Sequence, residues 1–287
     1  MGGARGGRAP SNCSMKTSKW PSAWEPLTPR GVAAFAGASL RRLLLVQLIV
    51  AILFAGLFVR FLIRAWVPVI RTAVDHLPAQ GRLRDQQLFW PADSSVQLAR
   101  NRFLGLAVDL NHSGFLVREA HLQLEFGRKN LRIMSAFGYQ VINYPPEWDF
   151  PFNRTDLVPW WGTWNYAILT VFALATPVCL MLVWFAIATI YCLPVFFISI
   201  FEKRKLGVLQ CWRVAAAALL PGTIFLTLGL LFYTHGWINF VHLVVIFALH
   251  LIIGWIYLYI SPLFVPKKGV GSARKRKPSK AKVTVQG

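Results

Sequence analysis

The chain has 287 residues, of which 55% are hydrophobic, and its mean hydropathy is +0.48. This composition is too apolar for an ordinary soluble domain. The formal net charge is +20, from 31 Lys and Arg against 11 Asp and Glu. In a soluble chain this excess would indicate nucleic-acid binding. Here the basic residues gather in short segments between apolar stretches, which is typical of a membrane protein and argues against a nucleic-acid partner.

The amino-terminal region is expected to form a tail followed by one membrane span. Residues 1–27 are rich in Gly, Ser and Arg, and we expect a disordered, basic, cytoplasmic segment. Residues 28–69 are expected to hold a short helix that begins at Thr28-Pro29 and continues into span 1. The apolar run Leu43–Val59 follows a long polar stretch and precedes no small-residue cleavage site. We therefore interpret it as a signal anchor and not as a cleavable signal peptide.

Region 70–159 is polar by comparison, and we expect a small extracytoplasmic domain there. It contains short stretches in which apolar and polar residues alternate, as in half-buried strands. Gly127 and Asn130 suit a hairpin turn between two of these stretches. We predict an antiparallel sheet of about four or five strands, followed by a proline- and aromatic-rich connector. The stretches are Gln87–Trp90, Phe103–Leu110, His121–Phe126, Leu131–Ala136 and Val141–Tyr144.

Residues 160–262 are expected to form a bundle of three spans. The first apolar segment, Trp160–Phe201, carries no charge and would measure roughly 60 Å as one helix, twice the thickness of the bilayer core. It crosses either once, as a long helix kinked near Pro177 or Pro194, or twice. One crossing fits better, because two would place the EKRK stretch and the basic C-terminal tail outside. The remaining spans are predicted at about 214–233 and 238–260.

The distribution of charge predicts that both termini lie in the cytoplasm. Most Lys and Arg residues fall in segments 1–42, 202–213 and 263–287, and the last carries eight basic residues and no acidic one. We expect these segments to contact anionic lipid headgroups, at about 1 kcal/mol for each basic residue. The predicted fold class is an α-helical integral membrane protein with four transmembrane helices and a small antiparallel β extracytoplasmic domain between spans 1 and 2.

Two histidines in the last span form a candidate intramembrane polar site. His242 and His250 lie about 80° apart around a helix, so both can face the bundle interior. An ionisable group at membrane depth is often functional, and the pair would suit a proton relay or polar pathway. The alternative is that each ring is neutral and hydrogen-bonded to a neighbouring helix. The predicted spans contain no Asp or Glu, and two histidines alone make a poor metal site.

A second candidate is a cationic stripe at the point where span 1 leaves the bilayer. Arg60, Arg64 and Arg71 fall within about 40° of one another on a helical projection, with Asp75 close by. Such a stripe suits lipid headgroups or an acidic partner. The alternative is that these long side chains simply extend toward the interface, as arginines do at helix ends. Pro68 can bend the helix and break the alignment.

The sequence contains no pattern that indicates an enzyme. It has no nucleophile elbow, phosphate-binding loop or HExxH sequence, and its four cysteines form no C-x-x-C pair. Asp109 ends a strand-like run next to Asn111, where Asp and Asn side chains commonly form turns. Turn formation is a simpler role for Asp109 than catalysis. We therefore expect no catalytic residue, no metal and no cofactor.

The layout of the chain resembles a family of uncharacterised bacterial membrane proteins, some labelled maltodextrin-utilisation proteins, whose bundle is similar to Yip1-type domains. The resemblance covers roughly residues 28–262 and depends on three features. They are a basic segment before one span, an external β-domain with Leu83–Trp90 and the AVDLNHSG sequence, and an Ala-rich span with Leu220-Pro221-Gly222. It implies a bacterial cytoplasmic membrane and a non-enzymatic role. The long basic tail and the extended second apolar segment depart from the family's pattern.

Two functional hypotheses follow from these observations. The first is a non-enzymatic integral membrane protein that acts as a scaffold, assembly or sensing subunit of a membrane complex, with other membrane proteins as partners. The second is a transporter or permease component with a polar pathway near His242 and His250.

Overall fold

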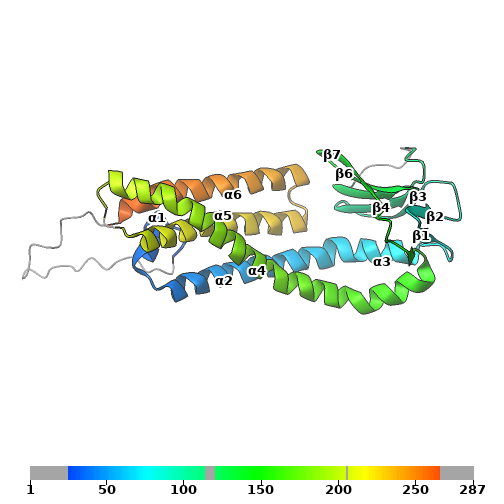
Figure 1. Ribbon diagram of the computed structural model, residues 1–287, viewed down its shortest axis with the longest axis horizontal. Helices are drawn as coiled ribbons and strands as arrows, with labels where there is room; N and C mark the ends of the chain where they lie inside the picture. The colour runs from blue at the N-terminus through cyan, green and yellow to red at the C-terminus, as the bar shows by residue number, and fades with distance from the viewer. Residues whose placement is uncertain (1–24, 114–119, 205, 266–287) are drawn as a thin grey trace, which may run out of the picture.

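The computed structural model describes residues 25–113, 120–204 and 206–265. The molecule is elongated, with a helical bundle along most of its length and a β-sheet domain at one end (Figure 1). The tails predicted at 1–27 and 263–287 lie mostly outside the described residues. Within the described part, four helices are long and apolar enough to cross a membrane, as the sequence predicted.

The short helix predicted at the start of the chain is confirmed, but it does not run directly into span 1. Helix α1 (Pro29–Ala34) is capped by the Thr28 hydroxyl, which accepts a hydrogen bond from the Gly31 amide at 3.0 Å. A 3₁₀ turn, η1 (Phe35–Gly37), follows. The chain is then extended up to Ser39, which caps the next helix. This break separates α1 from the first long helix.

The first long helix is continuous but contains one widened turn. Pro68 has no amide hydrogen, and its ring excludes the carbonyl one turn earlier, which accounts for the altered geometry. The carbonyl oxygen of Ala65, within this turn, accepts a hydrogen bond from the Asn101 side chain at 2.6 Å. The bend expected at Pro68 is thus a π-helical turn that bonds to the sheet domain. The parts of this helix are α2 (Leu40–Phe61), the π-helical turn η2 (Leu62–Trp66) and α3 (Val67–Asp75).

Two sheets form the β-domain between the first two long helices. One has three strands in the order β2-β1-β8, and the other has five in the order β3-β4-β5-β6-β7. The predicted hairpin around Gly127 is confirmed, with Leu124 of β5 opposite Ile133 of β6. The strands are β1 (Arg82–Arg84), β2 (Gln87–Phe89), β3 (Val96–Arg100), β4 (Leu104–Val108), β5 (Leu122–Phe126), β6 (Asn130–Ser135), β7 (Gly138–Asn143) and β8 (Phe150–Pro151).

The expectation of a purely antiparallel sheet was wrong at one pair, because β4 and β5 run parallel. A parallel pair needs a crossover of about a dozen residues or more, and the chain from Asp109 to His121 supplies that length. Strands β1, β3 and β8 were not predicted. Strands β1 and β8 have only three and two residues, which is too short for alternation to show.

Helix α3 forms part of the hydrophobic core of the β-domain. Its residues Val69 and Ala73 are buried in one cluster with Leu83, Leu98 and Leu106 of the strands. Burying each of these leucines contributes on the order of 2 kcal/mol. The end of the first long helix and the sheet are therefore one packed unit, and the connection between them is not a flexible tether.

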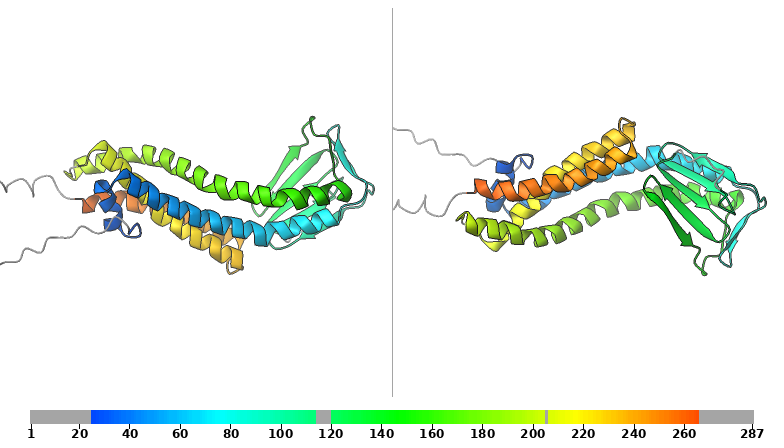
Figure 2. Two further views of the ribbon diagram at one scale, coloured as in Figure 1. Left: turned by 90° about the horizontal axis from the view of Figure 1, so that it is seen from below. Right: turned by 90° about the horizontal axis from the view of Figure 1, so that it is seen from above.

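The second apolar segment forms a single helix, as predicted. Helix α4 (Arg154–Phe201) has 48 residues and contains Pro159, Pro177 and Pro194 without interruption. Its N-cap, Asn153, accepts a hydrogen bond from the Asp156 amide at 3.0 Å. A helix of this length measures about 72 Å, well beyond the ~40–45 Å of a bilayer with its headgroups. Figure 2 shows α4 curving along the molecule from the sheet to the opposite end.

The last two long helices form a hairpin whose tip faces the sheet (Figures 1 and 2). Gly236 closes it in the left-handed conformation, with φ of 81°. Helix α5 is central in the bundle. Of the residues in its most apolar stretch, 67% are buried, whereas the corresponding share is 11% in α4 and 11% in the last helix. A Cβ atom on Gly222 would lie 2.3 Å from the His250 carbonyl oxygen, so the two backbones nearly touch. The elements are α5 (Val208–His235), α6 (Phe240–Ile260) and the 3₁₀ turn η3 (Ser261–Phe264).

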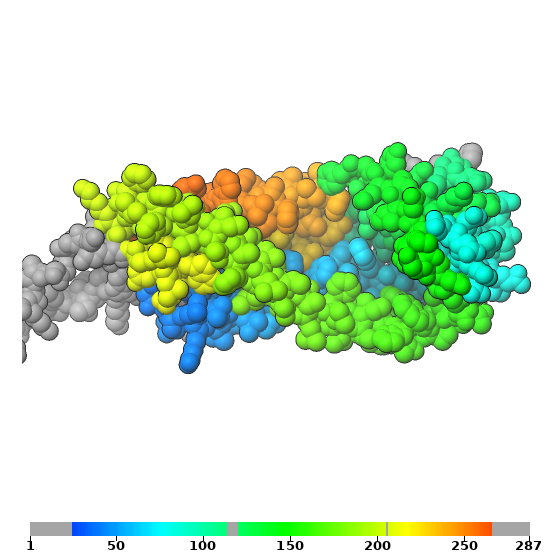
Figure 3. All heavy atoms as spheres, viewed as in Figure 1, coloured from blue at the N-terminus to red at the C-terminus, as the bar shows by residue number. Residues whose placement is uncertain are grey.

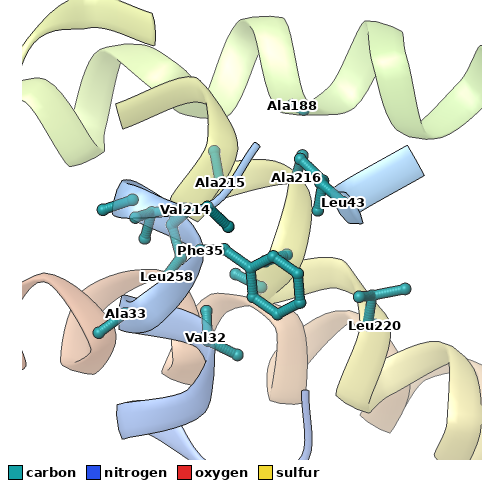
Figure 4. Packing of buried hydrophobic residues seen from close by; sticks show 14 of the residues in the cluster. Val32, Ala33, Phe35, Leu43, Ala188, Val214, Ala215, Ala216, Leu220 and Leu258 are labelled. Atoms are coloured by element: carbon teal, nitrogen blue, oxygen red, sulfur yellow. The ribbon is translucent and has the colours of Figure 1, made fainter. Parts of the chain in front are cut away.

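Helix α1 and turn η1 close the end of the bundle that lies away from the sheet. Val32 and Phe35 are fully buried. Figure 4 shows their side chains among residues of all four long helices. The small residues Ala215 and Ala216 of α5 are fully buried at the same place. Small side chains let helices approach closely, as expected for this Ala-rich stretch.

Candidate functional site

The two histidines of the predicted polar site lie on α6. His242 is exposed, and its Nδ1 is hydrogen-bonded to Asn239 Oδ1 at 2.6 Å. His250 is half-buried, and its Nδ1 contacts the carbonyl oxygen of Phe247. Each ring therefore bonds within its own helical segment. Among the described residues, no common partner joins the two side chains.

The three arginines of the predicted stripe are all exposed. Arg60 lies on α2, Arg64 in the π-helical turn and Arg71 on α3. The predicted alignment assumed a regular α-helix, whereas the wider turn lies between the first and the last of them. None of the three forms an ion pair with a described residue. Of the three, Arg71 lines a pocket.

Helices α3 and α4 enclose a groove made of two adjoining pockets, of about 350 Å³ and 360 Å³. We call it the α3–α4 groove. The pockets share Val67, Asn165 and Tyr166, so they are continuous along the helices. The first is also lined by Arg71, Val74, Asp75, Val158, Trp161 and Gly162. The second is also lined by Val59, Ile63, Leu169, Thr170 and Ala173.

The two ends of the α3–α4 groove differ in polarity. The end nearer the sheet contains Arg71 and Asp75, and Asn165 lies where the two pockets join. The other end contains mainly aliphatic side chains, such as Ile63 and Leu169. The Asn165 side-chain nitrogen donates to the carbonyl oxygens of residues 161 and 162, at 2.8 Å and 3.1 Å. These bonds fix the orientation of the amide and leave its oxygen directed away from the helix backbone.

A second candidate site is the contact between the sheet and the tip of the α5–α6 hairpin. We call it the sheet–hairpin junction. Arg102, which precedes β4, donates from its guanidinium to the carbonyl oxygens of Gly236 and Ile238, at 3.1 Å and 3.0 Å. Phe137 of the sheet contacts Phe240 of α6, with ring centroids 5.5 Å apart. Figure 3 shows bundle and sheet as two masses, joined along one side by the long helices.

His121 forms the polar centre of the sheet–hairpin junction. Its Nδ1 and the Tyr233 hydroxyl are hydrogen-bonded at 2.8 Å, and the two rings are stacked. Phe103 packs edge-on against Tyr233, with centroids 5.0 Å apart. Burial lowers the pKa of His121 below its usual value, and the positive charge of Arg102 lowers the pKa further. The His121 ring is therefore held neutral in the docked arrangement.

A buried polar network lies within the five-stranded sheet. The Glu125 side chain is 1% exposed, contacts Nδ1 of His112 and lies 3.7 Å from the Arg132 guanidinium. Nε2 of His112 is hydrogen-bonded to Asn130 at 2.6 Å. The described residues contain no group of three or more His, Cys, Asp or Glu side chains that could hold a metal ion. The network is best explained as a satisfied buried acid that fixes the sheet.

Asp109 adopts the turn geometry that the sequence favoured. Its carboxylate accepts hydrogen bonds from the Asn111 amide at 3.3 Å and from the Ser113 hydroxyl at 2.8 Å. Both arginines of segment 202–213 form hydrogen bonds within the molecule. Arg204 donates to the carbonyl oxygen of Val265, and Arg213 donates to that of Ala38 at 2.9 Å. These two arginines therefore tie chain segments together at one end of the bundle.

Sequence reasoning selected Arg71 and noted Asp75 close to it, but it missed Asn165 in the groove and Arg102 and His121 at the sheet–hairpin junction. Arg102 and His121 precede short strands in a region of mixed polarity, and nothing local predicts that they meet the hairpin tip. Asn165 is the one carboxamide side chain in the long apolar segment Trp160–Phe201. A polar residue within a predicted membrane helix is the one signal that would have selected it.

Comparisons with known proteins identify no relative: no family model, no curated protein and no solved structure matches the chain.

Proposed function

We propose that the chain is a non-enzymatic, multi-pass membrane protein that acts as a scaffold, assembly or sensing subunit of a membrane complex. The observation that carries the proposal is the fixed attachment of the β-domain to the helices. A domain held at a defined height and orientation suits the positioning or sensing of a partner better than a domain on a flexible linker does.

Three separate contacts support this fixed attachment. Helix α3 contributes to the core of the β-domain through Val69 and Ala73. The Asn101 side chain bonds the π-helical turn of the first long helix. Arg102 bonds the tip of the α5–α6 hairpin. The β-domain is thus joined both to the first long helix and to the tip of the α5–α6 hairpin.

The outer surface of the bundle supports the presence of partners. Helices α4 and α6 expose most of their apolar residues, whereas α5 is largely buried. Lipid covers part of such a surface, and a second membrane protein can cover the rest. Exposed aromatic residues lie on both helices, among them Phe185, Phe197, Phe247 and Trp255.

Charge distribution supports a placement with both termini in the cytoplasm and the β-domain on the opposite side; that the cell is bacterial is implied only by the resemblance of the layout. The basic segments 1–42, 202–213 and 263–287 then lie beside anionic headgroups. The residues from Phe201 to Gly207 connect α4 to α5 at the end of the bundle opposite the sheet. This arrangement agrees with the rule that basic loops remain on the cytoplasmic side.

The proposed function is tested by affinity purification of the full chain in mild detergent, followed by identification of proteins that co-purify. We expect a partner in fixed stoichiometry, and we expect its yield to fall in the Arg102→Ala variant, which loosens the β-domain. The matched control is Arg84→Ala, because Arg84 lies on an exposed strand and forms only a weak ion pair with Asp85 at 3.4 Å. A monomer that carries a bound solute and no partner would contradict the scaffold proposal and favour transport.

A further inference from the structure

The α3–α4 groove has the length and polarity of one leaflet of a lipid bilayer. Its lining on the first long helix extends from Val59 to Asp75, which is about 24 Å along a helix axis. Half of a bilayer with its headgroups measures about 20–22 Å. The charged end lies toward the sheet, and the aliphatic end lies toward the middle of the bundle. A ligand that fits both ends is amphipathic and lies parallel to the helices.

The charged end of the groove contains one cation and one anion that form no ion pair with each other. Arg71 and Asp75 are four residues apart on α3, so they lie on the same face with their Cβ atoms about 5–6 Å apart. Neither forms an ion pair with a described residue. A ligand headgroup with a negative and a positive group at similar spacing therefore matches them better than a purely anionic headgroup does.

The acceptor at the charged end of the groove favours a primary ammonium group. The Asp75 carboxylate has oxygen acceptors and no donor. A primary ammonium has three N–H donors, whereas a trimethylammonium has none. A headgroup with an additional carboxylate, such as phosphoserine, would place that carboxylate near Asp75, where the two like charges repel each other.

We propose that the α3–α4 groove binds a phospholipid with an ethanolamine headgroup, in the leaflet nearer the β-domain. Arg71 binds the phosphate, the Asp75 carboxylate accepts hydrogen bonds from the ammonium, and an acyl chain lies along Ile63 and Leu169. This inference rests on the membrane placement in the proposed function but not on any protein partner. A bound lipid at this place would fix the spacing of α3 and α4 where they carry the sheet.

The test is native mass spectrometry of the full chain, titrated with phospholipids of identical acyl chains and four headgroups: ethanolamine, choline, glycerol and serine. We expect the ethanolamine lipid to bind about tenfold more tightly than the others, since a charge-assisted hydrogen bond of this kind contributes on the order of tenfold in affinity. Arg71→Gln is expected to weaken all four lipids. Asp75→Asn is expected to remove the preference for ethanolamine and to leave the glycerol lipid unaffected or tighter.

Two further variants distinguish lipid binding in the groove from general electrostatic attraction of lipid to the protein surface. Gly162→Leu adds volume at a position where a Cβ atom meets nothing within 4 Å, so it fills the groove without disturbing the fold or the charges. It should reduce binding of the ethanolamine lipid as strongly as Arg71→Gln does. Arg60→Gln is the control, because Arg60 is exposed on α2 and does not line either pocket.

Equal binding of all four lipids would overturn the proposal, and so would unchanged binding in Gly162→Leu. Loss of binding in Arg60→Gln equal to that in Arg71→Gln would indicate diffuse charge attraction and would also overturn it. Each of these results leaves the membrane insertion and the partner purification unaffected. Failure of the lipid proposal is therefore distinguishable from failure of the proposed function.

Discussion

The interior of the bundle around α5 and the sheet–hairpin junction are built from different interactions. The bundle interior depends on small residues, such as Ala216 and Gly222, which let backbones approach closely. The junction depends on a few hydrogen bonds and aromatic rings around Arg102 and His121. The first interface has no room for added atoms, whereas the second can open without unfolding the helices. The difference indicates a tightly packed bundle and a β-domain whose contact with the hairpin depends on a few groups, while its packing on α3 is separate from that contact.

The strongest test of this contrast adds volume to the bundle interior. Gly222→Leu would place its Cβ atom 2.3 Å from the His250 carbonyl oxygen, where backbone cannot move aside. We expect destabilisation by about 3 kcal/mol or more, measured as a lower midpoint of thermal unfolding in detergent. Gly56→Leu on α2 is the control, since a Cβ atom there meets nothing within 4 Å. Equal stability of the two variants would contradict the close approach of α5 and α6.

The next test removes a buried charge from the sheet. Glu125→Ala leaves His112 and the nearby Arg132 guanidinium without their acid. We expect a loss of about 2 kcal/mol, visible as faster amide hydrogen exchange in β4, β5 and β6 and not in the helices. Glu147→Ala alters an exposed acid and should have no effect. Protection that falls equally in sheet and bundle would show that the two do not unfold separately.

A smaller effect is expected at the sheet–hairpin junction. Arg102→Ala removes two hydrogen bonds to the hairpin tip but leaves the aromatic contacts. Because Arg102 is exposed, the expected loss is only about 1 kcal/mol. The change should appear as faster proteolysis between β7 and α4, with the bundle's unfolding midpoint unchanged. The Arg84→Ala variant, which alters a strand away from the hairpin, should be cleaved at the wild-type rate.

The smallest expected effect is a pH dependence of docking. The pKa of His121 is lowered in the docked state, so the undocked state binds more protons below the ordinary histidine pKa of 6.5. Docking should therefore weaken as the pH falls below about 6.5, and it should level off once His121 is protonated in both states. Proteolysis rates between pH 7.5 and 5.0 measure this effect. A His121→Phe variant, which keeps a ring for stacking, should lose the pH dependence.

The helical part of the fold could be predicted from sequence because length and hydropathy are local properties. The apolar segment Trp160–Phe201 indicated one long helix, and α4 is one helix. The parallel pairing of β4 with β5 could not be predicted, because it depends on where the chain from Asp109 to His121 crosses. The groove could not be predicted either, because it is lined by Arg71 and Asn165, which come from two helices far apart in the sequence. Of these two residues, only Arg71 was selected from the sequence.

The central claim is that the β-domain is docked on the hairpin and not merely tethered. The most direct measurement is the distance distribution between spin labels at Gln140 on β7 and Trp237 at the hairpin tip, both of which are exposed. The four native cysteines would first be replaced by alanine. We predict one narrow distribution in the otherwise unaltered protein, and a broad one after Arg102→Ala. A broad distribution in both would contradict the claim.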